Sequence, residues 1–106
     1  GSGFFHGVIG LFLATAPGRL DALAAAVRKA DAEAVRSLAH ALRSTCGNVG
    51  AKTMHDLCAA LEERADRAPA DLAPMLQALL DEYRQVQTAL EAEQRRTRPA
   101  APRASS

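Results

Sequence analysis

Residues 38–50 read LAHALRSTCGNVG and place a histidine, His40, on the polar side of a strongly apolar segment. A helix advances about 100° per residue, and on such a helix the apolar positions of this region fall within a sector of roughly 80°. These positions are Val35, Leu38, Ala39, Leu42, Cys46 and Val49. His40 lies about 140° from the centre of that sector, so its imidazole is predicted to face solvent.

The residues around His40 on this polar face are small or basic. They are Ser37, Ser44 and Gly47, with Arg36 and Arg43 beside the histidine. A glycine inside a helix costs about 1 kcal/mol relative to alanine. Gly47 therefore indicates either the close approach of a partner or the end of the helix before a turn at residues 48–50. An exposed histidine can also be an ordinary surface residue, and helical spacing leaves that alternative open.

Hydrophobic periodicity along the rest of the chain predicts an all-α fold. The predicted helices cover residues 4–15, about 17–29, 31–47, 51–67 and 71–94. Pro17 fits the first turn of its helix, and Asp31 and Asp71 are suitable N-caps. Because short loops favour antiparallel packing, we expect an antiparallel four-helix bundle with a short additional N-terminal helix.

Composition and charge limit the classes of function. A length of 106 residues suits one domain, and a net charge of +1 gives no strong field for nucleic acid or an anionic membrane. Cys46 and Cys58 lack CxxC spacing and are expected to be reduced packing residues. The apolar segment near the start, 4–16, is short for a membrane span, so we expect a cytoplasmic protein without membrane contact.

The two ends are expected to lie outside the folded domain. Residues 1–3 read as an expression scar, and residues 95–106, with four arginines, two prolines and no acidic residue, read as a disordered basic tail. The domain is therefore assigned to residues 4–94.

The run HALRSTCGNVGA from His40 to Ala51, followed by Leu57-Cys58 and Leu61-Glu62, resembles the signature of histidine-containing phosphotransfer (HPt) domains. The resemblance covers about 25 consecutive residues, and the helical pattern extends it over most of the chain. Two positions depart from the family pattern. Ser44 stands where the family usually has glycine, and Arg43 stands where it often has lysine.

The resemblance implies a phosphorelay carrier in two-component signalling. His40 would accept a phosphoryl group from a receiver-domain aspartate and pass it to another receiver, with Arg43 and Arg36 stabilising the phosphoryl oxygens. Ser37, Ser44 and Gly47 would form the receiver docking face. No cofactor is expected on the chain itself, because the receiver would supply the Mg²⁺. The family also suggests the C-terminal module of a hybrid sensor histidine kinase as the parent protein.

Other readings of the sequence remain open. A helical interaction module could bind a receiver or an enzyme through the His40 face without phosphotransfer. No glycine-rich nucleotide loop is present, and Ala41 follows His40 where histidine kinases usually carry an acidic residue, so no ATP binding or autokinase activity is expected. The sequence contains no His-x-x-x-His or Glu-x-x-His pair, so no metal site is expected at His6 or His55, and His55 reads as a surface residue.

Overall fold

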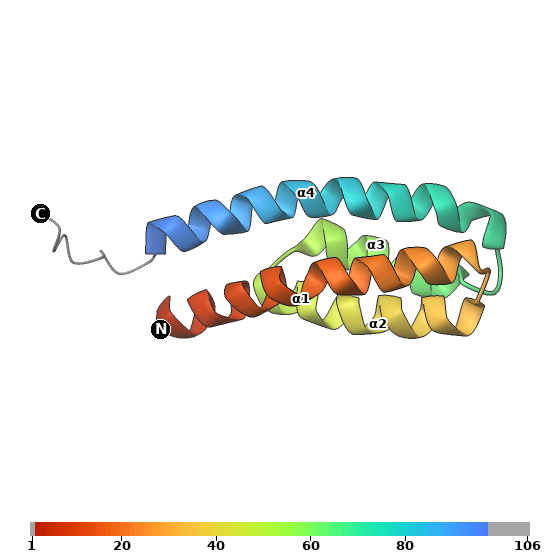
Figure 1. The fold of residues 1–106 in the computed structure, drawn as a ribbon, viewed down its shortest axis with the longest axis horizontal. Coiled ribbons are helices and arrows are strands. Elements are labelled where there is room, and N and C mark those ends of the chain that lie inside the picture. Colours follow the sequence, from red (N-terminus) through yellow and green to blue (C-terminus); the bar gives the residue numbers. More distant parts are fainter. Residues whose placement is uncertain (1, 98–106) are drawn as a thin grey trace, which may run out of the picture.

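Four antiparallel α-helices form an elongated bundle with principal extents of 58 × 23 × 17 Å (Figure 1). The computed structural model describes residues 2–97, and the side chains of residues 6–96. The elements are α1 (Ser2–Arg28), α2 (Ala32–Val49), α3 (Lys52–Arg64), a 3₁₀ turn η1 (Pro69–Asp71) and α4 (Leu72–Thr97). The predicted all-α bundle is confirmed. Figure 1 shows α1 and α4 extending past α2 and α3 at the end of the bundle where α1 begins.

The first helix differs from the prediction, because the expected break at Pro17 does not occur. The segment predicted as a short extra helix is the first half of α1, and Pro17 lies inside this 27-residue helix. Pro17 removes one backbone hydrogen bond, but it lies on the exposed side of α1. The buried stripe of Ile9, Ala16 and Leu20 continues past it without a change of phase. Packing of this continuous stripe onto the bundle outweighs the local cost of the proline.

The turns on either side of α2 are stabilised by hydrogen bonds to the helix ends. The Oδ1 atom of Asp31 accepts a hydrogen bond of 3.1 Å from the backbone N–H of Ala34, as predicted for an N-cap. At the other end α2 continues two residues beyond Gly47. Gly50 adopts a left-handed conformation (φ 77°), and the N–H of Ala51 donates to the carbonyl of Cys46 at 2.9 Å. This is a Schellman C-cap, for which glycine is the favoured residue.

The boundaries of the last two helices differ modestly from the prediction. Helix α3 ends at Arg64, three residues early, and α4 continues to Thr97, three residues late. Asp71 lies in η1, and its carboxylate accepts a hydrogen bond from the Arg64 guanidinium at 3.3 Å instead of capping α4. The basic tail expected from residue 95 therefore begins inside a helix. The remainder of that tail, and the first residue of the expected scar, lie outside the described residues.

The core runs the length of the bundle and is built from the predicted stripes. Its largest fully buried side chains are Ile9, Leu23, Leu42, Met54, Leu61 and Leu79. The two cysteines are free and fully buried between α2 and α3, in agreement with the prediction of packing residues. A hydrogen bond from Cys58 holds the pKa of Cys46 below its usual value, and this bond together with burial raises the pKa of Cys58.

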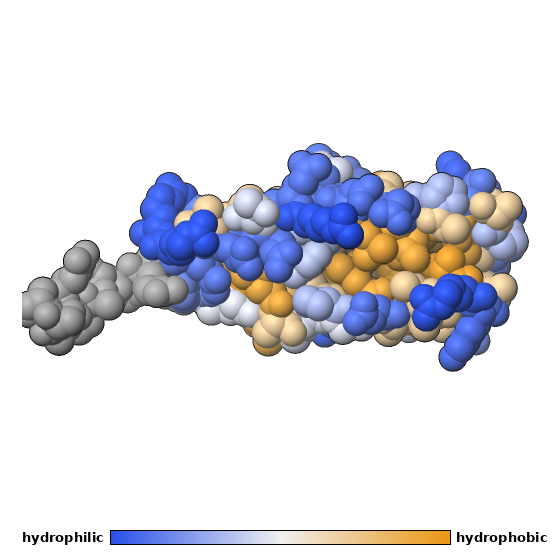
Figure 2. Space-filling model, turned by 45° about the horizontal axis from the view of Figure 1, so that its top comes forward, coloured by the Kyte–Doolittle hydropathy of each residue, from blue (hydrophilic) through white to orange (hydrophobic). Residues whose placement is uncertain are grey.

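Hydrophobic residues are also visible at the surface. Figure 2 shows a band of them between hydrophilic side chains, toward the end of the bundle where α1 turns into α2. Partly buried Ala24, Val27, Met75 and Leu80 belong to the helix segments at this end. The core is therefore covered incompletely on the face that Figure 2 presents.

A buried tyrosine on α4 gives the first testable prediction. Tyr83 packs against Phe12 with ring centroids 6.1 Å apart, and among the described residues its hydroxyl has no hydrogen-bond partner. A buried polar group without a partner costs about 1–3 kcal/mol. Tyr83→Phe is therefore expected to raise the free energy of unfolding by about 1 kcal/mol, measured as a higher urea midpoint at unchanged m-value. A lower midpoint would show that the hydroxyl has a partner, such as a bound water.

Helix α1 also passes a simple test for a membrane span. Residues His6–Arg28 are long and apolar enough to cross a membrane by length and composition, whereas the apolar segment predicted from the sequence, 4–16, is shorter. A core helix of a soluble protein and a signal sequence near the N-terminus both pass the same test, and 28% of this segment's most apolar window is buried in the bundle. In this bundle the apolar stripe of α1 forms one side of the core.

Candidate functional site

His40 stands in the middle of α2 with its side chain 57% exposed, as the helical spacing predicted. The preceding and following core residues, Ala39 and Leu42, are fully buried and anchor the helix beneath it. The ring is therefore presented to solvent from a rigid backbone.

One nitrogen of the imidazole is held by the neighbouring helix. The Nδ1 atom of His40 lies 2.9 Å from the Oε2 atom of Glu62, which projects from α3. The Glu62 side chain is only 22% exposed, so the carboxylate is fixed at the base of the imidazole. Because a carboxylate can only accept, we assign the hydrogen to Nδ1 of His40. Nε2 then carries the free lone pair.

Arg43 completes a compact group of three charged or ionisable side chains. Its Nη1 lies 3.5 Å from Glu62 Oε1, and its Nη2 lies 3.2 Å from His40 Nδ1. Glu62 Oε1 is buried and makes no hydrogen bond among the described residues, so the ion pair with Arg43 is its polar contact there. Arg43 therefore balances the charge of Glu62 while remaining one helical turn from the histidine. The structure brings these three residues together at one place on the α2–α3 surface.

The second predicted phosphoryl-stabilising residue is engaged elsewhere. The Nη1 atom of Arg36 donates to Asp66 Oδ2 at 3.0 Å, near the C-terminal end of α3. Both side chains are about half exposed, so this pair is a weak tether that an anion could displace. Arg36 thus lies on the correct face without touching His40 in this structure.

The predicted docking residues all lie on the exposed side of α2. Ser37, Ser44 and Gly47 are exposed, and the Ser44 hydroxyl makes only a long 3.5 Å contact with the carbonyl of His40. A Cβ atom built on Gly47 would meet nothing closer than Cδ2 of His55, at 3.9 Å. The fold itself therefore does not require glycine at position 47.

His55 pairs with its sequence neighbour and not with the His40, Arg43 and Glu62 group. His55 is 41% exposed and pairs with the adjacent Asp56, whose pKa this contact and Lys52 lower. No group of three or more histidine, cysteine or acidic residues with metal-site geometry is found within the described part of the chain.

Glu62 is the site residue whose role sequence reasoning did not assign. In the sequence, Glu62 is marked only as the second residue of the Leu61-Glu62 pair in the family pattern. A signal was available, because Leu61 lies in the apolar stripe of its helix and the antiparallel neighbour carries His40. Periodicity does not give the rotation of one helix against another, so the pairing needed the tertiary structure.

Comparison with known proteins agrees with this geometry. The family model of the Hpt domain matches residues 7–97. Among solved structures, the crystal structure of histidine-containing phosphotransfer protein B from Pseudomonas aeruginosa PAO1 is similar, with 27% sequence identity and a TM-score of 0.81. The match covers 86% of this chain and 80% of that chain. The search of curated proteins returned no match.

Proposed function

Because this chain belongs to the Hpt domain family, we propose that His40 is the residue that accepts and returns the phosphoryl group. The chain is a phosphorelay histidine carrier of two-component signalling, and receiver domains are its class of partner. One observation supports the assignment to His40 most strongly. Its ring is exposed while Nδ1 is bound to Glu62, which leaves Nε2 free to react.

In the proposed transfer, the lone pair of His40 Nε2 attacks the phosphorus of the receiver's aspartyl phosphate. The Nε2–P bond forms, the P–O bond to the aspartyl carboxyl group breaks, and the electron pair leaves on the receiver's carboxylate. The hydrogen on Nδ1 stays in its bond to Glu62, so no proton has to move in either direction. The carboxylate of Glu62 offsets the positive charge that the ring gains.

The other residues around His40 are proposed to assist the transfer by their charge and by their small size. Arg43, one turn from His40 and paired with Glu62, would turn toward the phosphoryl oxygens, and Arg36 would join it by releasing Asp66. Phosphoryl transfer depends mainly on positioning and charge neutralisation, so a carrier needs few residues of its own. The Mg²⁺ used in the reaction is expected on the receiver. Ser37, Ser44 and Gly47 leave room for the rim of the receiver's active site.

The wider context is also part of the proposal. We expect the parent protein to be a hybrid sensor histidine kinase with this domain as its C-terminal module, and the compartment to be the cytoplasm. The family supports exchange of phosphoryl groups with receivers, and the parent protein and the compartment are proposed beyond it.

The experiment that tests the function is labelling of the purified chain by a panel of receivers phosphorylated with ³²P on their aspartate. The expected product carries acid-labile, base-stable label on the peptide that contains His40. A stable complex with a receiver that never transfers label would contradict the proposal and support a binding module without chemistry.

Gly47 offers a test of the docking face that separates it from folding. Gly47→Ala is expected to raise the free energy of unfolding by up to ~1 kcal/mol, because alanine favours the helix and its Cβ meets only His55 at 3.9 Å. Transfer from the receiver is expected to slow several-fold, because the added methyl group separates the two surfaces. Urea denaturation and single-turnover transfer measure the two effects. An unchanged transfer rate would remove Gly47 from the docking face.

A further inference from the structure

A phosphoryl group carried by His40 would bring three oxygens that accept hydrogen bonds, and the neighbouring side chains decide what donates to them. The inference drawn from these neighbours rests on the function proposed for His40. Arg36 and Arg43 lie toward α3, where each pairs with a carboxylate. A further donor therefore has to come from the outward face of α2 or from its α1 flank.

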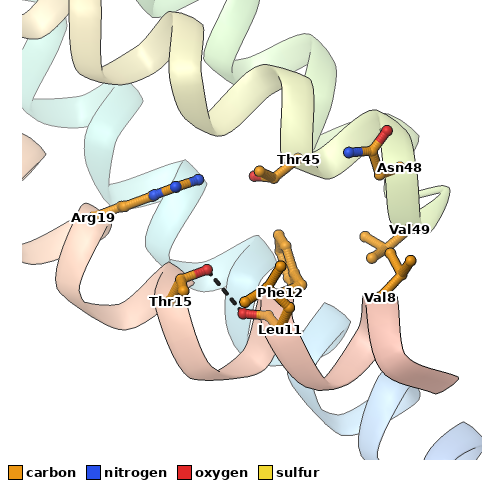
Figure 3. Close-up of a pocket in the computed structure, with 8 residues that line it drawn as sticks. All are labelled: Val8, Leu11, Phe12, Thr15, Arg19, Thr45, Asn48 and Val49. Carbon is orange, nitrogen blue, oxygen red and sulfur yellow. Dashed lines mark hydrogen bonds between the residues drawn. The ribbon is translucent and has the colours of Figure 1, made fainter. Parts of the chain in front are cut away.

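The α1 flank of α2 is largely apolar, and its hydroxyl groups are already bonded. Hydrophobic side chains of both helices line the space between them, together with Thr15 and Thr45 (Figure 3). The Thr45 hydroxyl donates to the Leu42 carbonyl at 2.9 Å. The Thr15 hydroxyl donates to the Leu11 carbonyl at the same distance, 2.9 Å. Neither threonine hydroxyl can donate to another acceptor without first breaking a good hydrogen bond.

Ser44 provides a hydroxyl on the outward face, close to His40. It follows the histidine by four residues, so the two Cβ atoms are neighbours about 5–6 Å apart. At about 100° per residue, Ser44 lies about 40° from His40 around the helix axis, and Arg43 lies about 60° from it in the other direction. Arg43 is on the side that meets α3, where it pairs with Glu62. The two side chains therefore bracket the histidine.

The bond between His40 and α3 turns the reactive nitrogen away from α3. Nδ1 of His40 is held 2.9 Å from Glu62 Oε2, so the opposite edge of the ring faces outward. Nε2 belongs to this outer part of the ring. A group bound to Nε2 therefore projects over the exposed face of α2, on which Ser44 lies.

The Ser44 hydroxyl is also available for a new acceptor. Its contact with the His40 carbonyl is 3.5 Å long, outside the range of about 2.5–3.0 Å for O–H···O hydrogen bonds. The corresponding bonds of Thr15 and Thr88 to their helices measure 2.9 and 3.1 Å. The serine therefore gives up little when its hydroxyl turns elsewhere. Glycine, the usual residue of the family pattern at this position, has no donor to offer.

We propose that the Ser44 hydroxyl donates a hydrogen bond to an oxygen of the phosphoryl group on His40, on the opposite side from Arg43. The bond exists only while His40 carries this group, so it stabilises the phosphorylated chain relative to the free chain. Hydrogen bonds to a charged acceptor are stronger than those between neutral groups. The chain therefore holds its phosphoryl group more tightly than a carrier with glycine at this position.

The test measures the transfer equilibrium, because docking cannot change it. A surface that only helps the receiver to bind speeds transfer equally in both directions and leaves the final partition of label unchanged. The purified chain is mixed with a receiver phosphorylated with ³²P on its aspartate, at concentrations where little complex forms, until the partition is constant.

A second donor removes the receiver altogether. Phosphoramidate is a small donor that phosphorylates a free imidazole without a protein surface. Its N–P bond breaks, the Nε2–P bond to His40 forms, and ammonia leaves with the electron pair. At a fixed ratio of phosphoramidate to ammonia, the labelled fraction of the chain gives the equilibrium constant directly.

Ser44→Ala is expected to lower the equilibrium constant for phosphorylation of the chain about three- to tenfold with both donors. Ser44→Gly is expected to give the same shift, because both variants lack the hydroxyl. The matched control is Thr88→Ala, which removes an exposed hydroxyl from α4 and is expected to leave the constant unchanged.

A wild-type equilibrium constant in Ser44→Ala would overturn the inference and leave the function of His40 intact. A shift in Ser44→Ala that is absent in Ser44→Gly would also overturn it, because the shift would then not come from the hydroxyl. Ser37, one turn before His40, is the alternative donor, and a shift in Ser37→Ala alone would move the bond there. Failure of the wild-type chain to take label from either donor would instead overturn the proposed function.

Discussion

A His40→Gln variant is expected to lose all acid-labile phosphoryl label, from receivers and from phosphoramidate alike. Glutamine has similar size and can still accept a hydrogen bond from Arg43, but its amide nitrogen has no free lone pair for attack on phosphorus. Because His40 is exposed, the substitution removes no core contact, and the thermal midpoint is expected to stay within a few degrees of wild type. Labelling with ³²P followed by acid treatment measures the loss.

The matched control is His55→Gln, which changes a second partly exposed histidine at the rim of the same face. It is expected to keep full labelling. Label that persists in His40→Gln and disappears in His55→Gln would move the phosphoacceptor to α3 and contradict the assignment. Equal labelling of both variants would indicate a different acceptor.

The second large effect is expected at Glu62, through the hydrogen on the His40 ring. With Glu62 present, Nδ1 donates and Nε2 keeps its lone pair. In Glu62→Ala, the remaining partner of Nδ1 in this group is Arg43, at 3.2 Å. An arginine can only donate, so it favours the tautomer with the hydrogen on Nε2, which cannot attack. Together with looser positioning of the ring, this is expected to slow transfer about 10- to 100-fold.

Two further variants distinguish this tautomer effect from simple structural damage. Glu62→Gln keeps an oxygen that can accept from Nδ1 and is expected to restore most of the rate. Glu62→Ala combined with Arg43→Ala removes the competing donor, so the fraction of His40 rings with the hydrogen on Nε2 is expected to be lower than in Glu62→Ala alone. Because Arg43 is also proposed to face the phosphoryl oxygens, this double variant is compared by its tautomer and not by its transfer rate. Ring ¹⁵N chemical shifts of His40 report the tautomer directly. A wild-type tautomer and rate in Glu62→Ala would show that Glu62 does not position the histidine.

Much of the site follows from local patterns. The 3.6-residue repeat of a single helix is enough to predict which of its side chains face solvent. It places His40 away from the core and predicts the exposure of Ser37, Ser44 and Gly47. The N-cap at Asp31 is equally local, because the side chain bonds to a backbone group three residues away. These features could therefore be predicted from the sequence, as could the bundle class and the cysteines in the core.

Other features depend on contacts between segments that are distant in sequence. Proline at position 17 predicts a helix start by local preference, yet the buried stripe on both sides of it packs as one surface and keeps α1 continuous. Arg36 and Arg43 each lie about one helical turn from His40, but Arg36 pairs with Asp66, in the turn after α3, and Arg43 pairs with Glu62 on α3.

The sequence by itself determined that a histidine would stand on the solvent face of a helical bundle, because helix periodicity and side-chain polarity are properties of one segment. Only the tertiary structure decided which ring nitrogen is held, which arginine lies beside it and which flank of the helix is apolar. Each of these depends on the rotation and offset of one helix against another. The rotation and offset are set when the apolar stripes of two helices pack together, so they cannot be predicted from the stripe of one helix.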